Sequence, residues 1–156
     1  MALLFVLRLR GIPDRSPDEE KALELLRLHK TFHATLVQDT PSIRGMLDKT
    51  LSSVVTYGEI RRDVLVELLK RRARITGNKK LTLEYLRKIG YGSFEELADA
   101  LLKGEVKLED IPGLKPVFRL RPPSGGFKGT IKKNIRAGGE TGYRGEAIND
   151  LILKML

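Results

Sequence analysis

The stretch TFHATLVQDTPSIRGML, residues 31–47, decides the fold class of this chain. Its first part is rich in β-branched and aromatic side chains, which predicts a β-strand over residues 31–37. Thr40-Pro41 then places a capping side chain directly before a proline, a pair typical of the start of a helix. Apolar side chains follow at helical spacing, and they are Ile43, Met46, Leu47, Leu51 and Val54. A strand is therefore followed closely by an amphipathic helix.

The residues on either side of this stretch continue the alternation of strands and helices. Residues 2–9, ALLFVLRL, form a short apolar run that predicts a buried strand. Ser16 begins a capping box with Glu19, which predicts a helix after it. Residues 54–57, VVTY, predict a further strand. The expected fold class is α+β, with a β-α-β-α-β core over residues 1–60 that packs one sheet against two helices.

The remaining residues, 61–156, predict a mostly helical C-terminal extension. The segments with helical spacing or helix caps are residues 61–74, 83–89, 93–104 and 148–155. Residues 117–120 alternate like a strand. Residues 124–145 contain seven glycines and fit no regular element, so they predict a long Gly-rich basic loop.

The net charge of +9 is distributed unevenly along the 156 residues. Residues 1–60 are neutral overall, whereas residues 61–80 and 111–156 each carry +6 and residues 81–110 carry −3. A solvated surface usually mixes both signs, so this clustering indicates a polyanionic partner such as a nucleic acid.

Composition and motifs argue against most kinds of chemistry. The absence of cysteine fits a cytoplasmic location and excludes thiolate sites, and no apolar run approaches the roughly 18 residues of a membrane span. His29 and His33 are four residues apart, but no third histidine and no cysteine completes a zinc site. Residues 124–130 do not match a phosphate-binding loop, and no nucleophile-elbow motif occurs. We therefore expect no catalysis, no cofactor, no metal, no membrane contact and no small-molecule substrate.

Two basic segments contain most of the candidate RNA-binding residues. Those of the first segment are Arg71, Arg72, Arg74, Lys79 and Lys80. One or two cations complement the dipole at a helix end, but this cluster exceeds that need. Those of the second segment are Arg119, Arg121, Gly125, Gly126, Lys128, Lys132, Lys133 and Arg136. Glycines let the backbone approach phosphates closely, and cations release the counterions condensed on RNA. Phe127 and Tyr143 are candidates for stacking on an unpaired base.

Three alternatives can be compared from the residues alone, and the first is disfavoured. A DNA-binding helix-turn-helix over residues 82–103 is disfavoured, because its second helix is acidic and the DNA groove would repel it. The chain could instead be a free regulatory nucleic-acid-binding protein. The acidic residues 81–110 could also form a docking face for a basic neighbouring protein.

Residues 25–30, LLRLHK, and residues 39–47, DTPSIRGML, resemble the core of the ribosomal protein family L-thirty, called L-seven in eukaryotes. The extension is similar to archaeal and eukaryotic members at residues 113–117, GLKPV, at residues 121–126, RPPSGG, and in its terminal amphipathic helix. Because the chain begins directly at its first strand, without the long basic leader of eukaryotic members, the archaeal type is expected.

The resemblance implies a three-stranded antiparallel sheet with two helices on one face, and no catalytic activity. It also implies large-subunit rRNA and neighbouring ribosomal proteins as partners, and we expect no homo-oligomer. Positions that are commonly basic in this family add Arg10, His29 and Lys30 to the candidate RNA-binding residues, and the motif of the second helix adds Arg44.

Overall fold

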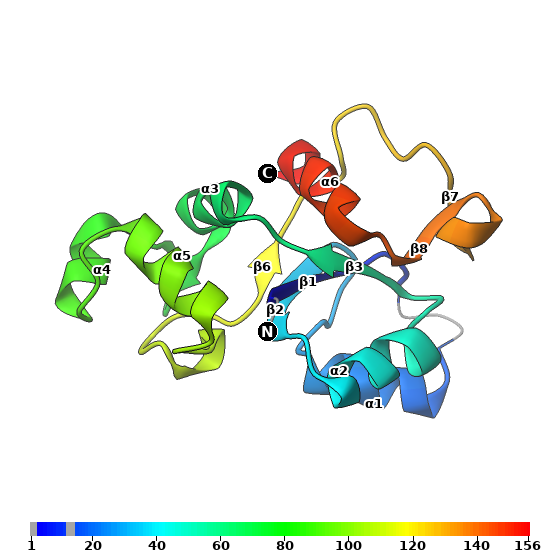
Figure 1. The fold of residues 1–156 in the computed structure, drawn as a ribbon, viewed down its shortest axis with the longest axis horizontal. Helices are drawn as coiled ribbons and strands as arrows, with labels where there is room; N and C mark the ends of the chain where they lie inside the picture. The colour runs from blue at the N-terminus through cyan, green and yellow to red at the C-terminus, as the bar shows by residue number, and fades with distance from the viewer. Residues whose placement is uncertain (1–2, 12–14) are drawn as a thin grey trace.

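The computed structural model describes residues 3–11 and 15–156, and its centre is a mixed six-stranded sheet in the order β6-β2-β1-β3-β8-β7 (Figure 1). The central strand β1 (Leu3–Arg8) pairs antiparallel with β2 (His33–Gln38) on one side and β3 (Val55–Glu59) on the other. All six residues of β1 are buried, as its continuous apolar run predicts. The expected first residue of this strand, Ala2, lies outside the described residues.

The α+β class is confirmed, but the expectation of a three-stranded sheet is wrong because the extension adds three strands to it. β6 (Phe118–Arg119) pairs antiparallel with β2, β8 (Gly139–Tyr143) pairs parallel with β3, and β7 (Thr130–Asn134) pairs parallel with β8. Residues 124–145 are therefore not simply a Gly-rich loop. Glycine is needed there for close backbone approach: a Cβ at Gly139 would lie 1.9 Å from the Lys133 carbonyl oxygen.

The sheet lies between two helical layers (Figure 1). On one face, α1 (Pro17–Leu25) and α2 (Pro41–Gly45), which continues into a π-helical turn over Met46–Thr50, cover Leu4 and Val6 of β1. The predicted caps are formed, since Ser16 and Glu19 make a reciprocal capping box and Thr40 accepts a hydrogen bond from the Ile43 amide.

The other face is covered by α3 (Arg62–Arg72), by α5 (Phe94–Lys103), which packs on α3, and by α6 (Ile148–Met155). These helices pack with Phe5 and Leu7 of β1, so one apolar cluster joins residues from both sides of position 60. Among the described residues, no helix is both long enough and apolar enough to cross a membrane.

A small hairpin and a further helix connect α3 to α5. β4 (Arg74–Ile75) and β5 (Lys79–Lys80) pair antiparallel around Gly77 and Asn78, which both adopt a positive φ. Gly77-Asn78 therefore forms a hairpin turn. α4 (Leu83–Lys88) follows, and the short 3₁₀ turns of the extension are Leu108–Asp110, Ile135–Ala137 and Gly145–Ala147.

Buried Asn149 fixes α6 to the end of β3. Its side-chain oxygen accepts from the Arg61 amide at 2.8 Å, and its side-chain nitrogen donates to the Glu59 carbonyl at 3.0 Å and to the Glu146 carbonyl at 2.9 Å. These bonds satisfy backbone groups where the strand ends and the next helix begins.

Replacing Asn149→Ala should lower the free energy of unfolding by about 2 kcal/mol or more, because it leaves buried polar groups without partners. The measurement is urea denaturation followed by circular dichroism. Asp150→Ala is the matched control on the exposed side of the same helix and should change stability by less than about 0.5 kcal/mol. Equal effects of the two substitutions would contradict this role for Asn149.

Candidate RNA-binding surface

The two basic segments meet at the edge of the sheet where β6 pairs with β2. Arg119 in β6 lies opposite His33 in β2, and the Leu120 amide donates to the Phe32 carbonyl at 3.1 Å. Arg72, at the end of α3, donates to the Arg119 carbonyl at 3.4 Å. Side chains that are far apart in the sequence therefore converge on this edge.

Cations crowd one another at this edge. Burial lowers the pKa of Arg72 below its ordinary value, and Arg121, Arg74 and Arg71 lower it further. Arg71 is paired with Glu67 at 3.5 Å, whereas the other three form no ion pair with a described residue. An anion from another molecule would offset this repulsion.

The hairpin and β2 widen the basic edge. Lys80 of β5 lies opposite Arg74 of β4, and both lysines of β5 are exposed. His29 and Lys30 are exposed just before β2. We call the following residues the edge cluster: His29, Lys30, His33, Arg71, Arg72, Arg74, Lys79, Lys80, Arg119 and Arg121.

Two residues missed by sequence reasoning organise this edge. The first is Arg8, whose buried guanidinium donates to the Leu28 carbonyl at 2.6 Å and to the Arg10 carbonyl at 2.7 Å. It thereby holds Arg10, a half-buried candidate, beside the segment that leads to His29. The Leu7-Arg8-Leu9-Arg10 alternation at the end of the apolar run is the sequence signal that marks this arginine.

The second missed residue is His33. Its Nδ1 atom is buried and has no hydrogen-bond partner among the described residues. Burial is the main cause of its lowered pKa, and the nearby cations Arg119, His29, Lys30 and Arg8 add to the effect. His33 is therefore held neutral near pH 7 within a positively charged environment.

The remaining cations of the second segment lie at the opposite end of the sheet from Arg119 and Arg121. Lys132 and Lys133 belong to the outer strand β7, Lys128 precedes it and Arg136 follows it. All four side chains are exposed, and none forms an ion pair with a described residue. We call these four residues the β7 strip.

Residues 120–129 connect the two basic surfaces. Gly125 and Gly126 are exposed and adopt φ values of +82° and +75°. A Cβ at either position would meet no atom within 4 Å, so the backbone conformation rather than lack of space requires glycine. Phe127 is half-buried, and its ring centroid lies 6.2 Å from that of Phe32. This stacking candidate is therefore less accessible to a base than the exposed Tyr143.

Arg44 is not brought together with the other candidates. Its guanidinium makes two hydrogen bonds to Asp39, at 2.8 and 3.0 Å, and a third to Glu59 at 3.1 Å. It also lies 4.7 Å from the ring centroid of Tyr143. The hydrogen bond to Asp39 raises the pKa of Arg44 and, in return, Arg44 lowers the pKa of Asp39. These protein contacts occupy its donors, so we leave Arg44 out of the RNA-facing set.

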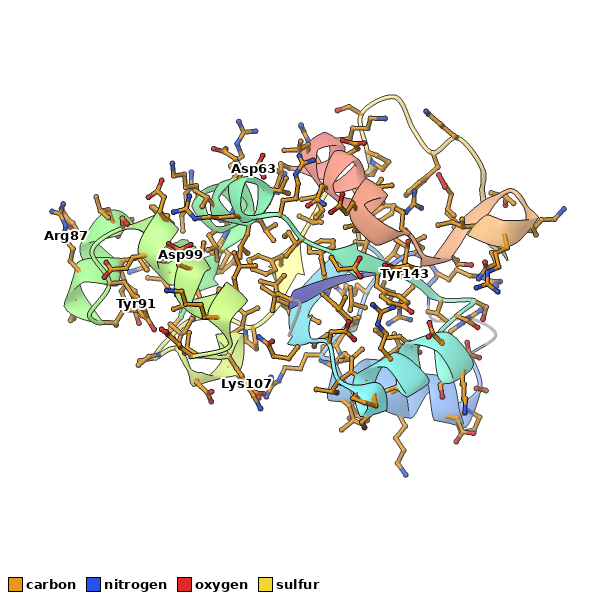
Figure 2. The ribbon with its side chains drawn as sticks, viewed as in Figure 1. Asp63, Arg87, Tyr91, Asp99, Lys107 and Tyr143 are labelled. Atoms are coloured by element: carbon orange, nitrogen blue, oxygen red, sulfur yellow. The ribbon has the colours of Figure 1, made fainter. Side chains whose placement is uncertain are left out.

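The acidic part of the extension forms ion pairs with its own basic helix. Asp99 of α5 pairs with Arg62 at 2.6 Å, and Glu95 pairs with Lys70 at 3.6 Å. The buried side of α5 faces α3 (Figure 2 labels Asp99 and Asp63 on these two helices). The exposed surface of α5 is acidic, unlike that of a helix that reads DNA. Over residues 3–11 and 15–156, no group of three His, Cys, Asp or Glu side chains could hold a metal.

Comparison with known proteins identifies the family of this chain. Residues 4–50 match the family described as Ribosomal protein L30p/L7e. A Thermofilum pendens protein named Large ribosomal subunit protein uL30 is 72% identical over 156 residues, which is 100% of both chains. Proteins of the same name from Ignicoccus hospitalis and Nanoarchaeum equitans are 52% and 50% identical, and each alignment covers at least 98% of both chains. The chain belongs to the ribosomal protein L30p/L7e family.

Family membership confirms the resemblance seen in the sequence, including its archaeal type, and identifies a ribosomal protein rather than an enzyme. The L30p/L7e match over residues 4–50 contains β1, α1, β2 and α2. The β7 strip lies outside this match, and so do Arg119, Arg121 and the basic residues 71–80. The full-length archaeal relatives cover both regions.

The lowered pKa of His33 predicts a pH dependence of stability. The folded state binds fewer protons here than the unfolded state, so stability should fall as pH falls from about 7 to about 5. His33→Gln should flatten this part of the curve of unfolding free energy against pH, measured by urea denaturation. Identical curves for the parent and His33→Gln would rule out this contribution.

Proposed function

We propose that this chain is a structural constituent of the archaeal large ribosomal subunit, in the cytoplasm, and that it binds large-subunit rRNA through phosphate and shape contacts. The observation that carries the proposal is the edge cluster. Arg74 and Arg121 lie close enough to Arg72 to lower its pKa, and no described carboxylate pairs with these three arginines. RNA phosphates would supply the missing negative charge, and backbone contacts of this kind fix the position of a protein on folded RNA.

The β7 strip supports the same proposal independently. An outer strand that carries unpaired lysines is a usual defence against edge-to-edge association. The strip, however, also ends a segment from Lys115 to Gly139 that contains no carboxylate. Binding such a segment to RNA would release condensed counterions, which favours association strongly at low salt.

The core contributes mainly a rigid platform. Residues 1–60 carry no net charge, and their exposed candidates His29 and Lys30 lie just before β2, which pairs with β6 of the extension. The acidic surface of α5 would face away from rRNA, where a basic neighbouring ribosomal protein is the partner of suitable charge.

A free regulatory nucleic-acid-binding protein remains the rival proposal. It would carry the same basic surfaces without entering a ribosome. Sedimentation of lysate from the source organism separates the two: the proposed function requires the chain to co-sediment with washed large subunits. Its presence only in the soluble fraction would support the regulatory alternative instead.

Neutralising the β7 strip lysines, Lys128, Lys132 and Lys133, to Gln should weaken binding to large-subunit rRNA and reduce its salt dependence. The slope of log K against log salt should fall by about 0.9 for each phosphate that is no longer neutralised, so by about 2–3 if all three lysines bind phosphates. The measurement is filter binding of the full chain to transcribed rRNA over a range of KCl concentrations.

The matched control removes the same charge from helices α4 and α5, with Arg87, Lys88 and Lys103 changed to Gln. These exposed side chains lie on α4 and α5 and form no ion pair with a described residue. The slope should change by less than about 1 for this control. If the two triple variants behave alike, only net charge matters, and the strip has no special role.

A further inference from the structure

A polar cavity of about 740 Å³ lies where the extension meets the core beside α2. Its lining comes from both parts of the chain: Arg44, Asp48, Ser52 and Tyr57 from the core, and Asn134, Arg136, Ala137, Gly142 and Tyr143 from the extension. Its volume is within the range of pockets that hold a small ligand. The proposed phosphate contacts of the edge cluster do not use this cavity.

Tyr143 gives the cavity a rigid aromatic surface. Its hydroxyl donates to the Glu59 carboxylate, whose oxygens lie 2.7 and 2.8 Å away, and its ring centroid lies 5.3 Å from that of Tyr57. The guanidinium of Arg44 lies 4.7 Å from the ring centroid. Nevertheless 46% of Tyr143 is exposed, between the sheet and α2 (Figure 2). An aromatic ring that is both fixed and exposed is well suited to stacking.

Arg136 gives the cavity a positive charge at its entrance. It is exposed and forms no ion pair with a described residue, and its amide donates to the Asn134 side-chain oxygen at 3.0 Å. The β7 lysines Lys132 and Lys133 are its neighbours along the chain. A phosphodiester strand lying along the β7 strip would therefore pass the mouth of the cavity.

Hydrogen-bonding groups complete the lining. Asp48, exposed at the π-helical turn, receives the Tyr57 hydroxyl on Oδ1, and its Oδ2 accepts no hydrogen bond from a described residue. The side-chain nitrogen of Asn134 likewise donates to no described residue, and the absence of a Cβ at Gly142, whose φ is +99°, leaves room for it. Turns with π-helical geometry occur frequently at functional sites.

We propose that this cavity binds one unpaired nucleotide of the rRNA, with its base stacked on Tyr143 and its phosphate at Arg136. Asp48 accepts hydrogen bonds, so it favours a base with an exocyclic amino group, adenine, cytosine or guanine, over uracil. This inference rests on the proposed function, and it adds base recognition to contacts that otherwise read only charge and shape.

Tyr143→Leu should weaken binding of the full chain to transcribed large-subunit rRNA by about tenfold, since stacking on the ring is abolished. The salt slope should stay unchanged, because no cation is removed. Tyr143→Phe keeps the ring and should bind within about twofold of the parent. Thermal melts of both variants, followed by circular dichroism, show whether each is folded at the assay temperature.

A second variant tests the cavity without removing any of its polar groups. Ala137→Leu, at an exposed lining position, should fill part of the cavity and weaken binding without a change in slope. Ala147→Leu, exposed but outside the lining, is the matched control and should bind like the parent. If Tyr143→Leu is unfolded, the rRNA affinity of Ala137→Leu alone tests the nucleotide site.

The failures of the two proposals are distinguishable. Parental affinity in both folded Tyr143→Leu and Ala137→Leu would overturn the nucleotide site while leaving rRNA binding intact. A parent chain that does not bind rRNA would overturn the proposed function.

Titration with oligoadenylate and oligouridylate, followed by tyrosine fluorescence, should show tighter binding of oligoadenylate, and equal binding would contradict the role of Asp48. A cross-link between a cavity-lining residue and a segment of another ribosomal protein, found in assembled subunits, would also overturn the nucleotide site.

Discussion

The parallel pairing of β8 with β3 is the interaction on which the rest of the arrangement depends. Without it, β3 would be an open edge of the sheet. The pairing is supported by the Thr56 hydroxyl, which donates to the Gly142 carbonyl at 2.9 Å, and by the Arg144 amide, which donates to the Tyr57 carbonyl at 2.8 Å. It positions β7 as the new outer strand, sets Tyr143 beside Tyr57 and brings α6 back onto the sheet.

The extension therefore acts at both ends of the sheet rather than as a separate appendage. At one end β6 brings Arg119 beside His33 and Arg72, and at the other end β7 carries Lys132 and Lys133. The neutral core lies between these two charged surfaces. This division explains how a protein of +9 net charge has a core with no net charge: residues 61–156 carry the whole excess of positive charge.

Local signals in the sequence predicted most helices correctly, because a cap such as Ser16 or Thr40 depends only on its neighbours. The β7–β8 pair was missed because the strand that β8 joins is distant in the sequence, with Thr56 opposite Gly142, and because glycine-rich strands resemble loops. Two features of the candidate residues could be seen only in the folded structure. Arg72 contacts Arg119, and Arg44 is held within the protein by its hydrogen bonds to Asp39. The clustering of charge in the sequence predicted basic surfaces, but it could not predict that they lie at opposite ends of one sheet.

The central claim is that the basic residues of the extension, over 71–80 and 119–136, present the RNA-binding surface. Hydrogen–deuterium exchange of the full chain, free and bound to large-subunit rRNA, tests it most directly. Binding should slow amide exchange over residues 71–80 and 119–136 and leave α4 and α5 unchanged. Protection confined to α4 and α5, with residues 119–136 exchanging as in the free protein, would contradict the claim.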